Sequence, residues 1–82
     1  MRAYRLGKQV VLFHGTKLKK AREAARKTLE DVAEACGVTR QAVGEWEQGE
    51  SNPRNDEVLT ALIACVGGRN AIERSGALEV FK

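Results

Sequence analysis

Residues 28–49 read TLEDVAEACGVTRQAVGEWEQG, and this stretch decides the fold. Thr28 is followed by Glu30 and Asp31, so a capping hydroxyl and two carboxylates stand beside the free amides of a first helical turn. Apolar residues then recur at helical spacing until Gly37, and glycine ends helices because it adopts the left-handed conformation cheaply. The pattern predicts a helix between Thr28 and Gly37.

The second half of the same stretch predicts another helix. Thr39 offers a second cap and Gly49 a second stop, so we expect this helix over residues 40–48. Its inward residues lie at i, i+1 and i+4 and are Ala42, Val43 and Trp46. Its outward residues are Arg40, Gln41, Gly44 and Glu45.

Four positions fit two short helices that cross at a tight turn. Ala33 is small where the second helix must pass close by, and Gly37 stands in the turn. Val38 and Val43 are apolar where the two helices must hold together. With all four in register, the stretch predicts a helix-turn-helix, a motif whose second helix enters the major groove of DNA.

The flanking sequence predicts shorter elements. Helical spacing continues over 16–26, where Thr16 is the expected cap, and over about 55–66, with a further helical turn at 70–75. The segments Gln9–Phe13 and Leu78–Phe81 are apolar and β-prone. Three arrangements remain open for them: pairing within one chain, pairing between two chains as a dimer sheet, or a loop and a tail on the bundle.

The length of 82 residues accommodates one domain with a modest core. We expect an N-terminal extension over 1–15, a helix-turn-helix domain over 16–67 and a C-terminal extension over 68–82. A domain this small gains stability from self-association, which favours a homodimer.

The charge is unevenly distributed along the chain. Residues 1–27 contain nine Lys or Arg and one acidic residue, whereas residues 28–53 contain one Arg and six acidic residues. The basic segment over residues 1–27 favours binding to phosphate. No run approaches the roughly 18 apolar residues of a membrane span, and the apolar run of residues 10–13 is too short for a secretion signal. We therefore expect a cytoplasmic protein with no membrane partner.

The sequence offers little for catalysis or metal binding. Cys36 and Cys65 have no neighbouring Cys or His at ligand spacing, His14 is distant from both, and we expect the two cysteines in the core. There is no nucleophile motif, His–carboxylate pair or glycine-rich phosphate loop. We expect neither an enzyme, a cofactor, a metal nor a small-molecule ligand.

The quoted stretch resembles the lambda-repressor-like DNA-binding domains of the Cro/repressor (Xre) type. The likeness covers about residues 16–67 and rests on three features: the Ala-x-x-x-Gly-Val spacing from Ala33, the Trp-Glu-x-Gly ending from Trp46, and the Asn52-Pro53 turn. The resemblance implies an all-α bundle of four to five helices, with short terminal β-strands as an allowed addition.

The resemblance also implies which side chains face DNA. Those on base edges would be Thr39, Arg40, Gln41, Gly44 and Glu45. Those on the backbone would be Arg26, Lys27, Thr28 and Arg54. Arg40 suits guanine, Gln41 adenine and Glu45 a cytosine amino group. Arg22 and Glu47 correspond to a structural ion pair. Leu29 replaces the family's usual glutamine, so one phosphate contact is lost.

These features together predict a sequence-specific regulator of transcription, a repressor that binds double-stranded DNA. One recognition helix reads only about four base pairs, so we expect a homodimer on a palindromic operator. The alternative is a protein-interaction module on the same fold, such as an antitoxin or a phage adaptor. The acidic residues around 40–48 motivate that alternative.

Overall fold

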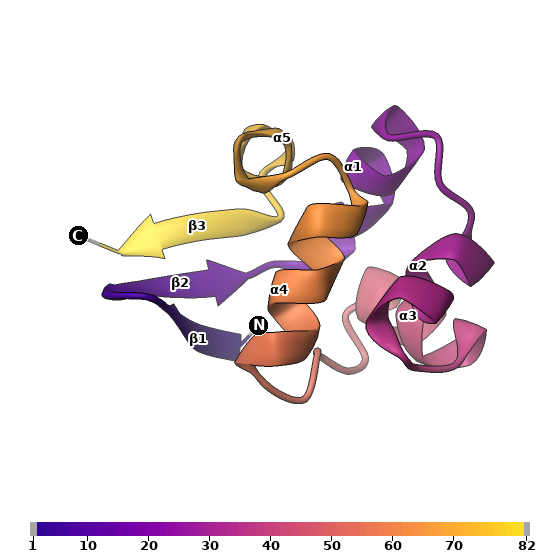
Figure 1. The fold of residues 1–82 in the computed structure, drawn as a ribbon, viewed down its shortest axis with the longest axis horizontal. Helices are drawn as coiled ribbons and strands as arrows, with labels where there is room; N and C mark the ends of the chain where they lie inside the picture. The colour runs from indigo at the N-terminus through magenta and orange to yellow at the C-terminus, as the bar shows by residue number, and fades with distance from the viewer. Residues whose placement is uncertain (1, 82) are drawn as a thin grey trace.

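The computed structural model describes residues 2–81 as a group of helices beside a small sheet (Figure 1). The elements in chain order are β1 (Arg2–Leu6), β2 (Gln9–Phe13), the 3₁₀ turn η1 (Gly15–Lys17), α1 (Leu18–Ala24), α2 (Leu29–Cys36), α3 (Arg40–Gln48), α4 (Asp56–Cys65), α5 (Arg69–Ser75) and β3 (Leu78–Phe81). The predicted helical bundle is present. The sheet lies at the end of the molecule away from α2 and α3 (Figure 1).

The helices α2 and α3 begin and end where the sequence predicts. Thr28 Oγ1 accepts a hydrogen bond from the Asp31 amide at 3.0 Å, and the Asp31 carboxylate accepts one from the Thr28 amide at 2.9 Å. This reciprocal capping box fixes the start of α2, and the Thr39 side chain caps α3. Gly37 and Gly49 end the two helices with φ of 67° and 78°.

The packing of α2 on α3 follows the expected pattern. Ala33, Val43 and Trp46 are buried, and Val38 packs against the same core. Gly15 has a role that the sequence did not reveal, because a Cβ there would lie 1.9 Å from the backbone oxygen of Trp46. Only glycine lets η1 pass this close to α3.

The first helix is shorter than predicted. The expected helix over 16–26 divides into η1 and α1, and Thr16 lies inside η1 instead of capping α1. Beyond α1, the amides of Arg26 and Lys27 donate to the carbonyls of Glu23 and Arg22 at 3.0 and 3.1 Å. This is a Schellman ending, with Arg26 at the left-handed position (φ 59°) where glycine is usual.

The sheet is larger than the sequence suggested. Strand β2 pairs with β3 in an antiparallel register that sets Val10 opposite Phe81, so the two β-prone segments pair within one chain. Strand β1 was not predicted. It forms a hairpin with β2 through Gly7-Lys8, in which Gly7 has the positive φ (62°) that two-residue hairpin loops require. Residues 2–81 therefore form five α-helices and a three-stranded sheet.

The terminal segments and the bundle share one core. Tyr4, Val11 and Phe13 from the hairpin are buried in the same cluster as Leu59 of α4 and Ile72 of α5. Apolar burial is the main favourable term in folding, so the sheet contributes to the stability of the helix-turn-helix.

Candidate DNA-binding surface

The outward side of α3 displays the side chains predicted to contact bases. Val43 and Trp46 are buried on its inner side, whereas Thr39, Arg40 and Gln41 are exposed. Gly44 and Glu45 are half-buried beside them. The structure therefore brings these five residues together at the start and along one side of α3.

Gly44 is notable because nothing in the fold requires it. A Cβ built at this position meets no atom within 4 Å in the described part of the chain. Glycine in a helix interior costs roughly 0.5–1 kcal/mol relative to alanine. The surface of α3 at Gly44 is therefore open to close approach from outside the chain.

Gln41 and Glu45 are linked to each other. Gln41 Nε2 donates to Glu45 Oε2 at 3.4 Å across one helical turn. Ser51 Oγ donates to the other carboxylate oxygen, also at 3.4 Å, from the connection after α3. Gln41 and Glu45 therefore lie side by side on the outward side of α3.

A hollow lies at the start of α2, next to α3. It has a volume of about 460 Å³ and is lined by Arg22, Lys27, Thr28, Leu29, Glu30 and Arg40. Lys27 and Arg40 thus meet at the positive end of a helix, which attracts anions, beside Arg22 and the carboxylate of Glu30. Lys27 and Thr28, predicted backbone contacts, share this hollow with Arg40. Leu29 packs on the core.

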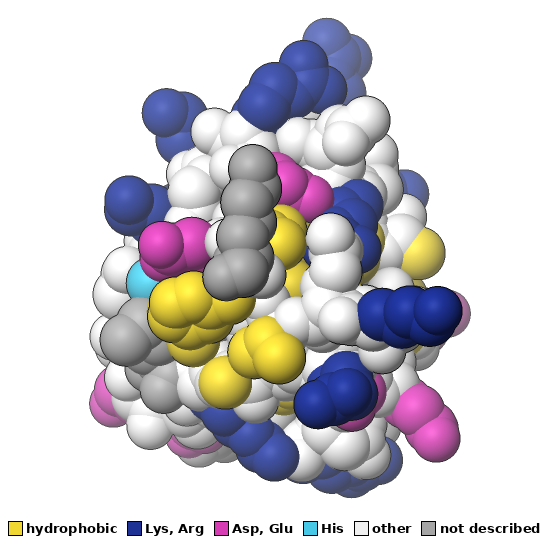
Figure 2. Space-filling view, turned by 90° about the vertical axis from the view of Figure 1, so that its left-hand side faces the viewer, with side chains coloured by type: hydrophobic (Ala, Val, Ile, Leu, Met, Phe, Trp, Pro, Cys, Tyr) yellow, Lys and Arg dark blue, Asp and Glu magenta, His cyan; other side chains and the backbone are white. Residues whose placement is uncertain are grey.

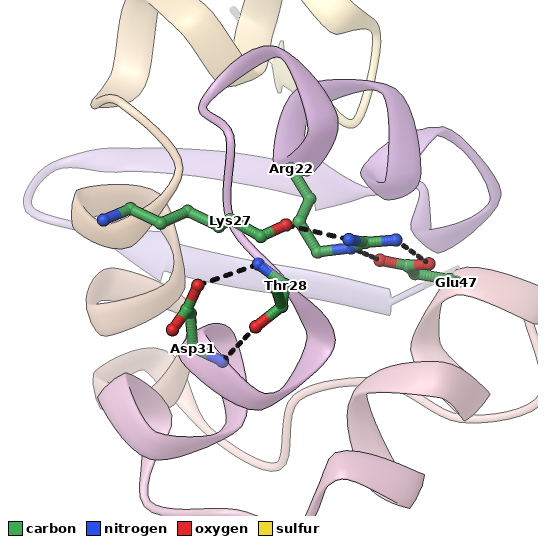
Figure 3. Close-up of polar contacts among 5 residues, drawn as sticks. All are labelled: Arg22, Lys27, Thr28, Asp31 and Glu47. Atoms are coloured by element: carbon green, nitrogen blue, oxygen red, sulfur yellow. Dashed lines mark hydrogen bonds and ion pairs between the residues drawn. The ribbon is translucent and has the colours of Figure 1, made fainter.

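The ion pair implied for Arg22 and Glu47 is present and has two bonds (Figure 3). Arg22 Nε lies 2.6 Å from Glu47 Oε2, and Nη2 lies 3.3 Å from Oε1. The bond to Glu47 raises the pKa of Arg22. Arg22 Nη1 also donates to the Lys27 carbonyl at 2.8 Å, which the sequence did not reveal. One guanidinium therefore ties α1, α3 and the entry to α2 together.

Arg26 does not line the hollow at the start of α2. It lines a separate hollow with Lys27, Asp31, Glu34, Ala35 and Cys65. The hydrogen bond from the Thr28 backbone lowers the pKa of Asp31, so its carboxylate is charged at neutral pH. Arg26 thus stands beside acidic side chains, whereas Lys27 borders both hollows.

Arg54 is exposed on the connection between α3 and α4, directly after the buried Pro53. The Pro53 carbonyl accepts hydrogen bonds from Tyr4 and Arg2 of β1. This contact was not predicted from the sequence because strand β1 was not predicted. The alternation of Tyr4 and Leu6 before the glycine of a two-residue loop was the signal that was available.

The sequence profile of the helix-turn-helix family matches residues 18–64 of this chain. The chain belongs to the helix-turn-helix family, of the Cro/repressor type. Members of this family are DNA-binding regulators of transcription and are not typically enzymes. The chain has no significant match among curated proteins or among solved structures.

Residues 2–81 contain no group of three or more His, Cys, Asp or Glu side chains placed to hold a metal ion. Cys36 is buried, and burial raises the pKa of its thiol to about 11, so it stays neutral. Among the same residues, no helix is both long enough and apolar enough to cross a membrane.

Proposed function

We propose that this helix-turn-helix protein is a repressor that binds a specific palindromic DNA site as a homodimer, with α3 in the major groove. The observation that supports this most directly is Gly44. A glycine without a reason inside the fold stands between exposed Arg40 and Gln41 and half-buried Glu45, where a base pair edge would approach the α3 backbone.

The side chains around Gly44 have distinct roles in the proposal. Arg40 donates two hydrogen bonds to guanine, as its forked guanidinium allows. Gln41 reads adenine, and Glu45, which lies beside it, accepts from a cytosine amino group. Thr39 contacts the base edges at the start of α3.

The backbone contacts hold α3 in register. A phosphate occupies the hollow at the start of α2, which Lys27 and Thr28 line. Arg54 contacts the backbone on the far side of α3, and Arg26 makes a weaker contact because Asp31 and Glu34 lie beside it. Arg22 and Glu47 fix the geometry without touching DNA.

The sheet supplies the surface for the homodimer. The strand order β1-β2-β3 leaves β3 at an edge with one unpaired side. Phe81 and Val10, opposite each other in register, are 54% and 38% exposed and are the large hydrophobic side chains exposed in residues 2–81. Figure 2 shows apolar side chains gathered on this end of the molecule. Exposed apolar clusters mark interaction sites.

Selection from a pool of random duplexes at several salt concentrations tests the proposed function. We expect enrichment of a palindrome, with affinity that falls steeply as salt rises. Arg40→Ala and Gln41→Ala should each change the preferred sequence, whereas Arg74→Ala, an exposed charge on α5, should not. Unchanged preference in the Arg40 and Gln41 variants would contradict the assigned reading face.

One observation favours the second candidate, a protein-interaction module. Glu45 and Glu50 place negative charge near the outward side of α3, and the ion pair with Arg22 neutralises only Glu47. Absence of enrichment even at low salt, together with a folded protein, would favour this module over the repressor.

A further inference from the structure

Strand β1 holds the connection that carries Arg54. The Pro53 carbonyl accepts hydrogen bonds from the Tyr4 hydroxyl at 2.5 Å and from Arg2 Nη1 at 3.2 Å. Three residues later, Asp56 Oδ1 accepts a bond from the Arg5 amide at 3.2 Å. The chain is therefore fixed on both sides of Arg54 by the same strand.

Tyr4 is a rigid anchor for this contact. Its side chain is buried, and its ring meets Phe13 edge-on with centroids 6.5 Å apart. Burial raises the pKa of Tyr4 to about 12, so the hydroxyl remains protonated and donates at physiological pH. A buried donor of this kind keeps the turn in one position.

Arg2 adds a second positive charge at this turn. Its guanidinium carbon lies 5.2 Å from the centre of the Tyr4 ring, and one N–H is used on Pro53. Arg2 is exposed, so its other donors are open to solvent. Standard bond lengths place Arg2 Nη1 within about 6 Å of the Arg54 Cα. The exposed Arg54 side chain therefore starts close to the Arg2 guanidinium, and two cations that can reach one anion from neighbouring positions favour its binding.

We propose that β1 is part of the DNA-binding surface, where Arg2 and Arg54 together hold one stretch of phosphate backbone and Tyr4 positions the turn between them. This inference rests on the proposed function. It extends the surface beyond the matched family segment, which begins at residue 18.

The test compares Arg2→Gln with Arg74→Gln. Both remove one exposed charge, but Arg74 lies on α5, away from Tyr4 and from the exposed pair Val10 and Phe81. Affinity for a fixed duplex is measured over a range of salt concentrations. Each lost phosphate contact should lower the salt slope by about 0.9 and weaken binding roughly threefold to tenfold. We expect this for Arg2→Gln and Arg54→Gln and a much smaller change for Arg74→Gln.

The variant Tyr4→Phe tests the positioning of the turn separately from the charges of Arg2 and Arg54. It should weaken binding without changing the salt slope, because no charge is lost, and a thermal melt verifies that the variant is folded. Equal salt slopes for Arg2→Gln and Arg74→Gln, in a protein that binds DNA, would overturn this inference alone. Failure of the unaltered protein to bind any duplex at low salt would overturn the proposed function as well.

Discussion

The Arg22–Glu47 pair shows how one contact supports the whole site. Its side chains are only 11% and 9% exposed. Breaking a buried pair from one side leaves an uncompensated charge, so we expect Glu47→Gln to cost about 3 kcal/mol of unfolding free energy. Urea denaturation measures this. The double variant Arg22→Met with Glu47→Leu should recover most of the loss, and a cost below about 1 kcal/mol for the single change would contradict this assignment.

Arg26 adopts a backbone conformation that suits glycine. Its φ of 59° costs a non-glycine residue about 1 kcal/mol. Arg26→Gly should therefore raise the unfolding free energy by about that amount, as measured by urea denaturation. Lys19→Gly, inside α1, is the matched control and should lower it by a similar amount. If both variants lose stability, the left-handed strain at Arg26 is not significant.

Tyr4 gives stability a dependence on alkaline pH. Its pKa is about 12 in the folded chain and 10.0 when unperturbed, so its contribution is complete below pH 10 and is lost as the pH rises toward 12. Cys36 acts in the same direction from pH 9 to about 11. Unfolding free energy measured from pH 8 to 12 should fall over both ranges. In Tyr4→Phe the fall above pH 10 should be shallower, and an unchanged profile would count against burial of the hydroxyl.

Gly15 and Gly44 affect α3 in different ways. Gly15 allows η1 to pack against α3, whereas Gly44 bears on the proposed contact of α3 with DNA. Gly44→Ala meets no atom in the fold and should stabilise α3 by about 0.5–1 kcal/mol, while it weakens specific DNA binding. Gly15→Ala should destabilise by about 1–3 kcal/mol because the new Cβ collides with the Trp46 backbone. Thermal melts and duplex titrations measure the two effects. Undiminished DNA binding by Gly44→Ala would remove the main support for the reading face.

Local signals made α2 and α3 predictable from the sequence. Thr28, Gly37, Thr39 and Gly49 each act within a few residues of their own position, so caps and stops are visible without the fold. The end of α1 was not predictable in this way, because Arg26 carries no sequence mark of a left-handed turn. Strand β1 depends on burial of Tyr4 against distant residues, which only the assembled core supplies.

The candidate site could be predicted only in part for the same reason. Helical spacing alone put Arg40, Gln41 and Gly44 on one side of α3. The meeting of Lys27, Thr28 and Arg40 around one hollow depends on how α2 crosses α3, and the link from β1 to Pro53 depends on long-range packing. Neither is encoded by spacing along one element.

At the scale of the whole molecule, the sheet and α3 lie at opposite ends (Figure 1). Pairing of two copies through the sheet would therefore leave both α3 helices free for DNA. The long axis of one copy is 32 Å, so two copies joined end to end at their sheets extend to about twice that length, close to two turns of DNA at roughly 34 Å each. Half-sites about two turns apart are thus within reach of a dimer joined at its sheets.

Lysine substitutions at the exposed end of the sheet should dissociate the proposed homodimer into monomers. Val10→Lys with Phe81→Lys places two charges in the exposed apolar cluster, where a dimer would have to desolvate them. Sedimentation equilibrium should show a dimer for the unaltered protein and a monomer for this variant. Ala24→Lys with Ala64→Lys adds the same charge at exposed helical positions and should remain dimeric.

On DNA, the monomer should still bind one half-site but lose most of its preference for the palindrome, because the linked second contact is gone. A variant that stays dimeric would place the interface elsewhere on the molecule.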